Sequence, residues 1–168
     1  MNETGGPELT HLDAAGHAHM VDVLSKEKTR RRAVAQCSVS MSEQAASAIA
    51  NGDVVKGDVL AVARVAGIQA AKRTADLIPL CHPLMIGAVS IEFDLEERSV
   101  RIAASVETLE RTGVEMEALT ACSVAALTIY DMCKSIDKGM TSGSSHFWRK
   151  LAENLVRTPA TSSTILNR

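Results

Sequence analysis

The sequence EMEALTACSVAALTIYDMCK, residues 115–134, predicts one long helix whose charges lie only at its two ends. No charged residue occurs from Ala118 to Tyr130, so most sides of this helix should be buried. We expect the helix to extend from about residue 115 to about residue 137. A sheet would cover one side, and in a chain of 168 residues a second subunit is the expected cover for another.

The charges at the two ends have both structural and functional interpretations. Asp131 and Lys134 are three residues apart, so they share a helix face and can form an ion pair. The helix dipole disfavours an acid near the C-terminal end, which favours a functional role for Asp131, while a plain structural ion pair is the alternative. Glu115 and Glu117 begin the helix, where acids are common because the dipole favours them.

The length of the helix bears on whether its two ends can act together. Glu117 and Asp131 are fourteen residues apart, which is roughly 21 Å at 1.5 Å per residue. The two ends therefore cannot contact one small ligand within a single helix. If two such helices packed antiparallel about a two-fold axis, the N-terminal end of each helix would lie beside the C-terminal end of the other. This spacing leads to the hypothesis of a site shared across a dimer interface.

The composition is that of a soluble globular protein with few aromatic residues. Hydrophobic residues make up 46% of the chain, charged residues 23% and aromatic residues 2%, and the net charge is −2. The low aromatic content and the absence of a basic excess argue against nucleic-acid binding. The N-terminal residues lack a signal-peptide pattern, and no run of about 18 apolar residues predicts a membrane span. We therefore expect a cytoplasmic protein of one domain.

The cysteine and histidine patterns do not predict a metal or a cofactor. The cysteine spacing fits neither a zinc site nor a disulfide framework, so we expect reduced, buried thiols. These cysteines are Cys37, Cys81, Cys122 and Cys133. His17 and His19 could ligate a metal, but two histidines with no further ligand nearby are a weak signal.

The remaining patterns predict an α+β domain in which an antiparallel sheet carries helices on one face. We expect strands at 19–23, 33–39, 88–95 and 100–106, with a solvated turn at 26–32 and a hairpin through the polar link 96–99. Ser42 should cap a helix that closes at Asn51 and Gly52, and Asp58 should cap a second helix that ends before Pro79. A further helix, capped by Ser144 or Ser145, is expected at about 145–157.

Three other stretches carry candidate binding residues. Cys81 and His82 lie in a loop held rigid by two prolines, where a structural, hydrogen-bonded histidine is the alternative to a ligand-binding one. Lys56 precedes a predicted helix N-terminus, a position that attracts anions. Lys72 lies near the end of that helix, where a cation also offsets the helix dipole.

Taken together, the stretches LTHLDAAGHAHMVDV, KGDVLAVARVAGIQAAKRTADLIPLCHPLMI and TGVEMEALTACSVAALTIYDMCK resemble the MoaC family, the cyclic pyranopterin monophosphate synthases of molybdenum cofactor biosynthesis. The resemblance covers roughly residues 9–140. It implies a ferredoxin-like fold, a hexamer built from dimers, and a site at a subunit interface. It also implies conversion of 3′,8-cyclo-7,8-dihydroguanosine 5′-triphosphate to cyclic pyranopterin monophosphate and pyrophosphate, without a cofactor, a membrane or a nucleic-acid partner.

The resemblance also implies roles for individual residues. The catalytic group would comprise Asp131, Lys134 and Lys56. The substrate-binding residues would be Leu80, Cys81, His82, Glu115, Met116, Glu117, Lys26, Arg31 and Lys72. Lysines and arginines suit a triphosphate and a departing pyrophosphate, and an acid beside a lysine or a histidine suits the proton transfers of ring opening and closure.

The sequence departs from the family after Met140. The family has a short strand there and then a G-G-K-S-G loop, whereas this chain continues TSGSSHFWRKLAENLVRT without those glycines, with Lys150 near the position of the loop lysine. We expect a flexible arm at 1–18, the domain at 19–157 and a disordered tail at 158–168. The alternative to a synthase is a weakly active or inactive paralogue that binds nucleotide or associates with another subunit.

Overall fold

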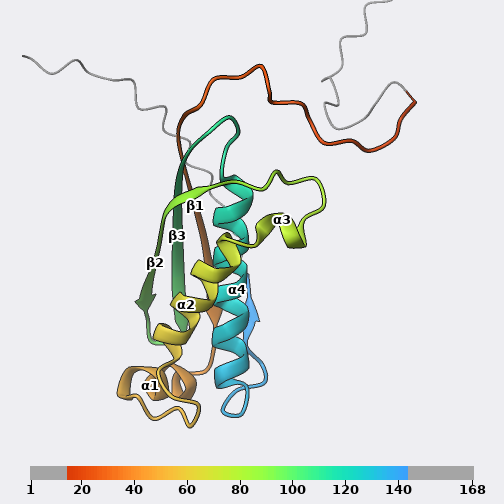
Figure 1. Cartoon of the computed structure of the whole chain (residues 1–168). Helices are drawn as coiled ribbons and strands as arrows, with labels where there is room; N and C mark the ends of the chain where they lie inside the picture. Colours follow the sequence, from red (N-terminus) through yellow and green to blue (C-terminus); the bar gives the residue numbers. More distant parts are fainter. Residues whose placement is uncertain (1–14, 144–168) are drawn as a thin grey trace, which may run out of the picture.

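The computed structural model describes residues 15–143, which form an α+β fold with a four-stranded antiparallel sheet (Figure 1). The described part covers most of the expected domain, whereas most of the expected arm at 1–18, the helix at 145–157 and the tail at 158–168 lie outside it. The elements in chain order are β1 (Thr29–Ser40), α1 (Glu43–Asn51), α2 (Val59–Ala71), α3 (Thr74–Leu77), β2 (Ile86–Leu95), β3 (Ser99–Glu110), α4 (Glu115–Cys133) and β4 (Thr141–Ser142).

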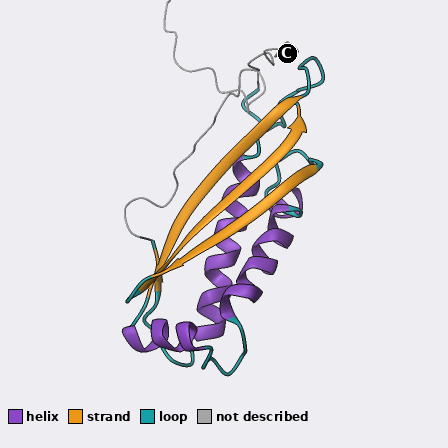
Figure 2. Ribbon diagram, turned by 90° about the vertical axis from the view of Figure 1, so that its left-hand side faces the viewer, coloured by secondary structure: helices purple, strands orange, loops and turns teal. Residues whose placement is uncertain are grey.

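The strands have the spatial order β2-β3-β1-β4, and the helices lie on one face of the sheet (Figure 2). β1 pairs along its whole length with β3, from Thr29 opposite Glu110 to Ser40 opposite Ser99. The predicted hairpin is confirmed, because β2 and β3 pair antiparallel through the link after Leu95. Alternate residues from Val100 to Val106 are buried, as the predicted sheet with helices on one face requires.

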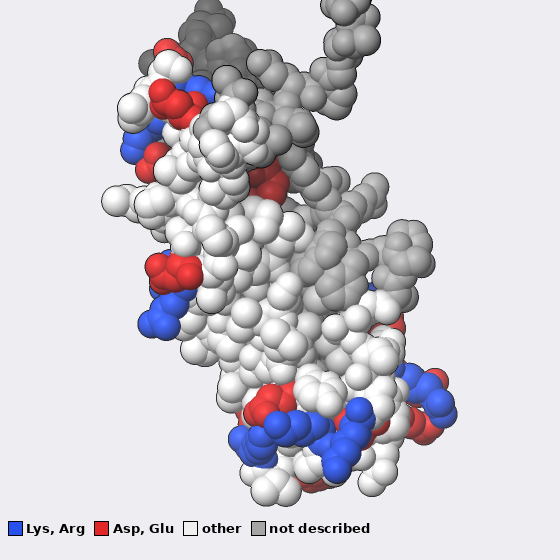
Figure 3. Space-filling view, turned by 90° about the vertical axis from the view of Figure 1, so that its right-hand side faces the viewer, with Lys and Arg blue, Asp and Glu red and all other residues white. Residues whose placement is uncertain are grey.

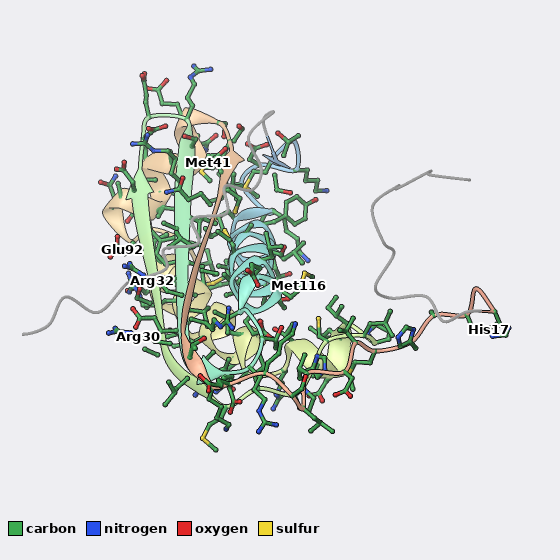
Figure 4. The ribbon with its side chains drawn as sticks, turned by 90° about the horizontal axis from the view of Figure 1, so that it is seen from above. His17, Arg30, Arg32, Met41, Glu92 and Met116 are labelled. Carbon is green, nitrogen blue, oxygen red and sulfur yellow. The ribbon has the colours of Figure 1, made fainter. Side chains whose placement is uncertain are left out.

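Two expectations for the N-terminal third of the domain are wrong. Residues 19–23 form no strand, although their apolar and polar residues alternate; Val21 and Val23 are instead half-buried against a pocket. The charged run at 26–32 is not simply a turn, because β1 begins at Thr29. Arg30 and Arg32 project from the outer face of the sheet, away from the helices (Figure 4), and both form ion pairs with Glu107 on β3.

The helix caps agree with the prediction, and so does the end of the second helix before Pro79, but the end of α4 does not. The side chains of Ser42 and Asp58 accept hydrogen bonds from backbone N–H groups at the starts of α1 and α2. α2 stops at Ala71, where the Thr74 hydroxyl donates to backbone carbonyls of the last turn, and α3 follows as a separate short helix. α4 stops at Cys133 rather than near 137, because the chain turns and the Asp137 carboxylate accepts from the Ser42 N–H and the Gly139 N–H.

Small residues allow α2 and α4 to pack closely. A Cβ atom added at Gly67 of α2 would lie 2.3 Å from Ile91 Cδ1 and 2.8 Å from the Ala121 carbonyl oxygen of α4. The facing residues of both helices are mostly alanine, among them Ala63 and Ala125, which are fully buried. The position of α2 against α4 therefore depends on the absence of large side chains at their contact.

The long helix is buried on the sides facing the sheet and α2, and one side remains exposed in the single chain. Leu127 is 64% exposed and Tyr130 38% exposed, although both are apolar or aromatic. By length and mean hydropathy, α4 would qualify as a membrane span, but 56% of that window is buried inside the fold, as in the core helix of a globular protein.

The four cysteines are all free thiols. Cys37, Cys122 and Cys133 are buried as expected, whereas Cys81 is only partly buried, which corrects the expectation for that residue. Cys37 of β1 and Cys122 of α4 approach each other in the core, with 3.0 Å between their sulfur atoms.

Candidate active site

Three predicted catalytic residues meet at the C-terminal end of α4. The Lys56 Nζ donates to Oδ2 of Asp131 at 2.7 Å and to the backbone oxygen of Asp131 at 2.8 Å. The Lys134 Nζ lies 2.7 Å from Oδ1 of the same carboxylate. The ion pair across one helix turn was foreseeable from the spacing, but the convergence of Lys56 on it follows only from the fold. We call these three residues the lysine–aspartate cluster.

The turn that carries Lys56 positions it by way of α2. Gly57 adopts a φ of 96°, a left-handed conformation that favours glycine, and Asp58 then caps α2. Because α2 packs along α4, the start of α2 lies beside the end of α4 (Figure 1). The K-G-D sequence therefore delivers the Lys56 side chain to Asp131.

The electrostatics of the cluster favour an ionised acid and a bound anion. Hydrogen bonds from Lys134 and then Lys56 lower the pKa of Asp131 to about 2, and Asp131 in turn raises the pKa of Lys134. Two ammonium groups share one carboxylate, so the cluster keeps a net positive charge. The side chains are 47% to 56% exposed, which leaves both lysines able to contact a ligand.

A pocket of about 330 Å³ lies at the opposite, N-terminal end of α4. Its lining combines the start of α4, the loop 80–84 and part of the segment before β1. The residues are Val21, Val23, Lys26, Leu80, Cys81, His82, Leu84, Thr112, Gly113, Glu115, Met116 and Glu117. Seven of the predicted substrate-binding residues are therefore brought together, and we call this space the α4 N-terminal pocket.

Glu117 is the most buried acid of the α4 N-terminal pocket. The residue is only 4% exposed, and burial raises the pKa of its carboxyl group. Burial, together with the nearby charge of Glu117, also raises the pKa of the Cys81 thiol. Cys81 is therefore held in the neutral thiol form, which does not favour a role as a nucleophile.

His82 joins the loop to the N-terminal segment. Its Nε2 lies 2.9 Å from the backbone oxygen of Val21, within hydrogen-bonding distance. This contact holds the segment 19–23, which was predicted to be a strand, beside the pocket. Such a hydrogen bond is the structural role that the sequence analysis gave for His82 as the alternative to ligand binding.

Two predicted substrate-binding residues lie outside this pocket. Lys72 lines a separate, smaller cavity of about 90 Å³, which shares His82 and Glu117 with the α4 N-terminal pocket. Arg31 is half-buried at the same end of the sheet, and its Nε has no hydrogen-bond partner among residues 15–143. The sequence analysis did not single out Arg111, but its buried Nε also has no hydrogen-bond partner among residues 15–143.

The remaining pocket residues that sequence reasoning missed have little chemical signature. Val21, Val23 and Leu84 are aliphatic and contribute only shape. Thr112 and Gly113 could have been found, because they directly precede the predicted helix, where a loop backbone often contacts ligands.

The two groups of candidate residues do not meet within one chain. They lie at opposite ends of α4, separated along the helix by roughly 21 Å. Viewed from the right-hand side of Figure 1, most of the visible charged groups gather at the two ends, and the visible surface between them is mostly uncharged (Figure 3). Exposed Leu127 and Tyr130 belong to α4 itself.

Metal ligation has no support within residues 15–143. That part of the chain contains no group of three or more histidine, cysteine or acidic side chains arranged to hold a metal ion. His17 lies at the far end of the N-terminal segment, well away from the helices (Figure 4).

Comparison with known protein families identifies the family of the chain. The family model described as the MoaC family matches residues 20–152, which is most of the 168-residue chain. The matched range contains every residue of the lysine–aspartate cluster and of the α4 N-terminal pocket. It also extends past Met140 into the part of the chain where the sequence departs from the expected glycine loop.

Proposed function

Since the chain belongs to the MoaC family, we propose that it is a cyclic pyranopterin monophosphate synthase, a lyase of molybdenum cofactor biosynthesis. The proposed reaction converts 3′,8-cyclo-7,8-dihydroguanosine 5′-triphosphate to cyclic pyranopterin monophosphate and pyrophosphate. The cytoplasm is the expected location, and no resident cofactor is invoked.

The observation that carries the proposal is the lysine–aspartate cluster. Asp131 contacts Lys134 and Lys56 at 2.7 Å each, which supports a catalytic role for all three. Asp131 would stay ionised and accept a proton from substrate, while the ammonium groups would stabilise phosphate charge and can donate protons. The excess positive charge suits a reaction that releases pyrophosphate.

Substrate binding is assigned to the other end of α4 and its surroundings. Support comes from the α4 N-terminal pocket, which gathers most of the predicted substrate-binding residues around a ligand-sized space. These residues are Lys26, Leu80, Cys81, His82, Glu115, Met116 and Glu117. Lys72 in the adjoining cavity and Arg31 at the same end of the sheet would add positive charge for the triphosphate.

A complete site would then require two subunits. An antiparallel pair of α4 helices would bring the lysine–aspartate cluster of one subunit to the α4 N-terminal pocket of the other. The exposed apolar side of α4, with Leu127 64% exposed, supports burial against a partner. We propose a homo-oligomer, a hexamer built from such dimers, with the ferredoxin-like fold that the β-α-β-β-α-β order supports.

A second candidate is a weakly active paralogue that binds nucleotide or joins another subunit. The observation in its favour is the sequence after Met140, which lacks the glycine loop of the family. One family feature of that region is present: β4 at Thr141–Ser142 pairs with the end of β1. The synthase is favoured because all three residues of the cluster are present and in contact.

Turnover of the cyclic dihydroguanosine triphosphate decides between the two candidates. The full chain should yield pyranopterin and pyrophosphate, followed by product oxidation and fluorescence and by a phosphate assay. Asp131→Asn should lower kcat by at least about a hundredfold, because a positioned acid or base contributes that much, and should leave the assembly intact. Absence of turnover by the wild-type chain would favour the paralogue.

A further inference from the structure

We propose that Asp137 is a positioning residue of the candidate active site: its carboxylate joins the turn after α4 to the start of α1 and so holds both lysines of the lysine–aspartate cluster in contact with the aspartate. The inference rests on the proposed function, because the cluster is proposed to carry the chemistry. Asp137 acts through the backbone of the two segments that supply the lysines, and not on the substrate.

Both oxygens of the Asp137 carboxylate accept hydrogen bonds from backbone groups. Oδ2 accepts from the Ser42 N–H at 2.7 Å, and Oδ1 accepts from the Gly139 N–H at 2.8 Å. These two bonds, with that from Ser42 the stronger influence, lower the pKa of Asp137, so the group is ionised at neutral pH. Hydrogen bonds to an ionised acceptor are stronger than those between neutral groups. The carboxylate therefore fixes backbone positions in two separate segments.

The first of these segments is the turn that ends α4. The N–H groups of Ile136 and Asp137 both donate to the Cys133 carbonyl oxygen, at 2.8 and 3.1 Å. Lys134 caps the C-terminal end of α4 and lies within this turn. Because Asp137 is hydrogen-bonded at the far side of the turn, the path of the chain after Lys134 is fixed. The Lys134 side chain then reaches Asp131 from a defined point.

The second segment begins at Ser42 and leads through α1 to the turn that carries Lys56. The Ser42 hydroxyl caps α1 by accepting from the Ala45 N–H, while its own N–H donates to Asp137. The buried residues of α1 are the two alanines Ala45 and Ala46, whose small side chains bury little apolar area. The hydrogen bond to Asp137 therefore helps to place α1 at the end of α4, where both lie in Figure 1.

The lysine–aspartate cluster needs both segments in place. Lys134 comes from the end of α4 and Lys56 from the chain that follows α1. Each ammonium nitrogen lies 2.7 Å from an oxygen of Asp131. Misplacement of a reacting group by about 1 Å can lower a rate by about a hundredfold. Asp137, which joins the two segments, is placed to prevent such a shift.

Titration of Asp131 in Asp137 variants of the full chain tests the inference. In Asp137→Ala both acceptor oxygens are lost, so the lysine contacts should loosen and the pKa of Asp131 should rise from about 2 toward 3.8. The carboxyl carbon shift of Asp131, followed by NMR against pH, measures this midpoint. A residue that merely stabilised the fold would not move it, because the cluster of the folded molecules would be unchanged.

Turnover of the cyclic dihydroguanosine triphosphate gives a second measurement. Asp137→Ala should lower kcat by about tenfold, because the lysines are displaced from the reacting atoms. KM should change by less than about threefold, because the proposed substrate-binding pocket lies at the other end of α4. Asp137→Asn keeps one acceptor oxygen and should give an intermediate kcat and an intermediate midpoint for Asp131. This milder variant also provides the test if Asp137→Ala does not fold.

Asp94→Ala is the matched control. It makes the same change at an exposed aspartate of β2, whose partner is Arg101 of β3, and should keep the wild-type midpoint and kcat. A folded Asp137→Ala variant with an unchanged Asp131 midpoint would overturn the inference, even if its Tm were lower. If that variant does not fold, an unchanged midpoint in Asp137→Asn has the same meaning.

The result is separable from the test of the synthase reaction. If the wild-type chain turns over the cyclic substrate but the Asp131 midpoint does not depend on Asp137, the synthase stands and the positioning role fails. If the midpoint depends on Asp137 but the wild-type chain shows no turnover, the positioning of the cluster stands and the synthase proposal fails.

Discussion

Asp131 is the residue on which the charged end of α4 converges, because both neighbouring lysines contact its carboxylate. The pKa of Asp131 is about 2, lowered first by Lys134 and then by Lys56. Since this folded pKa lies below the ordinary 3.8, the ion pairs contribute to stability above pH 3.8 and are lost as the pH falls through about 2. Asp131 therefore remains ionised throughout the neutral range.

Removal of the first lysine should be visible in the titration of Asp131. In Lys134→Ala the pKa of Asp131 should rise from about 2 toward 3.8, because the largest stabilising hydrogen bond is gone. The carboxyl carbon shift of Asp131, followed by NMR against pH, measures this midpoint. Lys138→Ala, a charge change four residues further along the chain, serves as the control and should not shift it. An unchanged midpoint in Lys134→Ala would mean that the ion pair does not form in solution.

Glu117 should make stability depend on pH in the direction opposite to Asp131. Burial raises the pKa of Glu117 above its ordinary 4.5, so the folded protein holds this proton more tightly than the unfolded chain. The associated stabilisation is complete below pH 4.5 and is lost as the pH rises through the folded pKa. Glu117→Gln, which cannot ionise, should therefore raise Tm at pH 8 by a few degrees and leave it nearly unchanged at pH 4.

Thermal unfolding at the two pH values checks this prediction. Glu92→Gln removes an exposed carboxylate and should change Tm little at either pH. A Glu117→Gln variant that loses stability at pH 8 would show instead that the ionised carboxylate has a favourable partner in the folded protein.

The contact between α2 and α4 is the element on which the position of Lys56 depends. Gly67→Ala would put a methyl group 2.8 Å from the Ala121 backbone oxygen, so one helix must move. Overpacking of this kind costs about 1–3 kcal/mol, partly offset by the roughly 1 kcal/mol by which alanine is the better helix former. We expect a lower Tm and a weaker contact between Lys56 and Asp131.

A double variant separates the two clashes at Gly67. Ile91→Val removes the Cδ1 atom, the nearer of the two contacts at 2.3 Å, but leaves the backbone oxygen in place. Added to Gly67→Ala, it should restore only part of the lost Tm in a denaturation scan. Full recovery would show that the side chain alone was responsible, and an unchanged Tm in Gly67→Ala would mean that the helices can separate at little cost.

Local sequence signals predicted most elements of this fold correctly. The caps at Ser42 and Asp58 and the alternation along β3 depend on neighbouring residues, and these elements formed as expected. The errors occurred where distant residues decide. Residues 19–23 have strand-like alternation but find no partner strand within residues 15–143. The charged residues at the start of β1 join the sheet, where Glu107 of β3 forms ion pairs with Arg30 and Arg32.

The residues of the candidate site could be predicted from the sequence, but their arrangement in space could not. Asp131 and Lys134 lie within one helix turn, so their contact follows from the spacing. The contact of Lys56 with Asp131 depends on the packing of α2 against α4, which no local pattern specifies. Val21 and Val23 reach the pocket through the bond between His82 and the Val21 backbone, a contact 61 residues apart in sequence.

At the scale of the whole molecule, the separation of the two groups along α4 leads to a test with mixed subunits. Asp131→Asn disables the lysine–aspartate cluster, and His82→Ala disables the α4 N-terminal pocket, so each variant alone should be inactive. In a mixed dimer with shared sites, one site receives both changes and the other receives none. Random pairing of equal amounts makes half of the dimers mixed, so activity should recover to about a quarter of the wild-type value.

Co-expression with two different affinity tags, followed by tandem purification, gives the mixed assembly directly. The expected recovery then rises to about half, because every dimer is mixed.

The control pairs Asp131→Asn with Lys56→Ala. Both changes affect the same cluster, so in a mixed dimer each of the two sites keeps one defect, and activity should stay at the level of the single variants. Recovery in the first pair but not in the second requires that the two ends of α4 act across subunits. If neither pair recovers although mixed assemblies form, each chain must complete its own site. The lysine–aspartate cluster and the α4 N-terminal pocket of one chain would then have to be connected by other parts of the same chain.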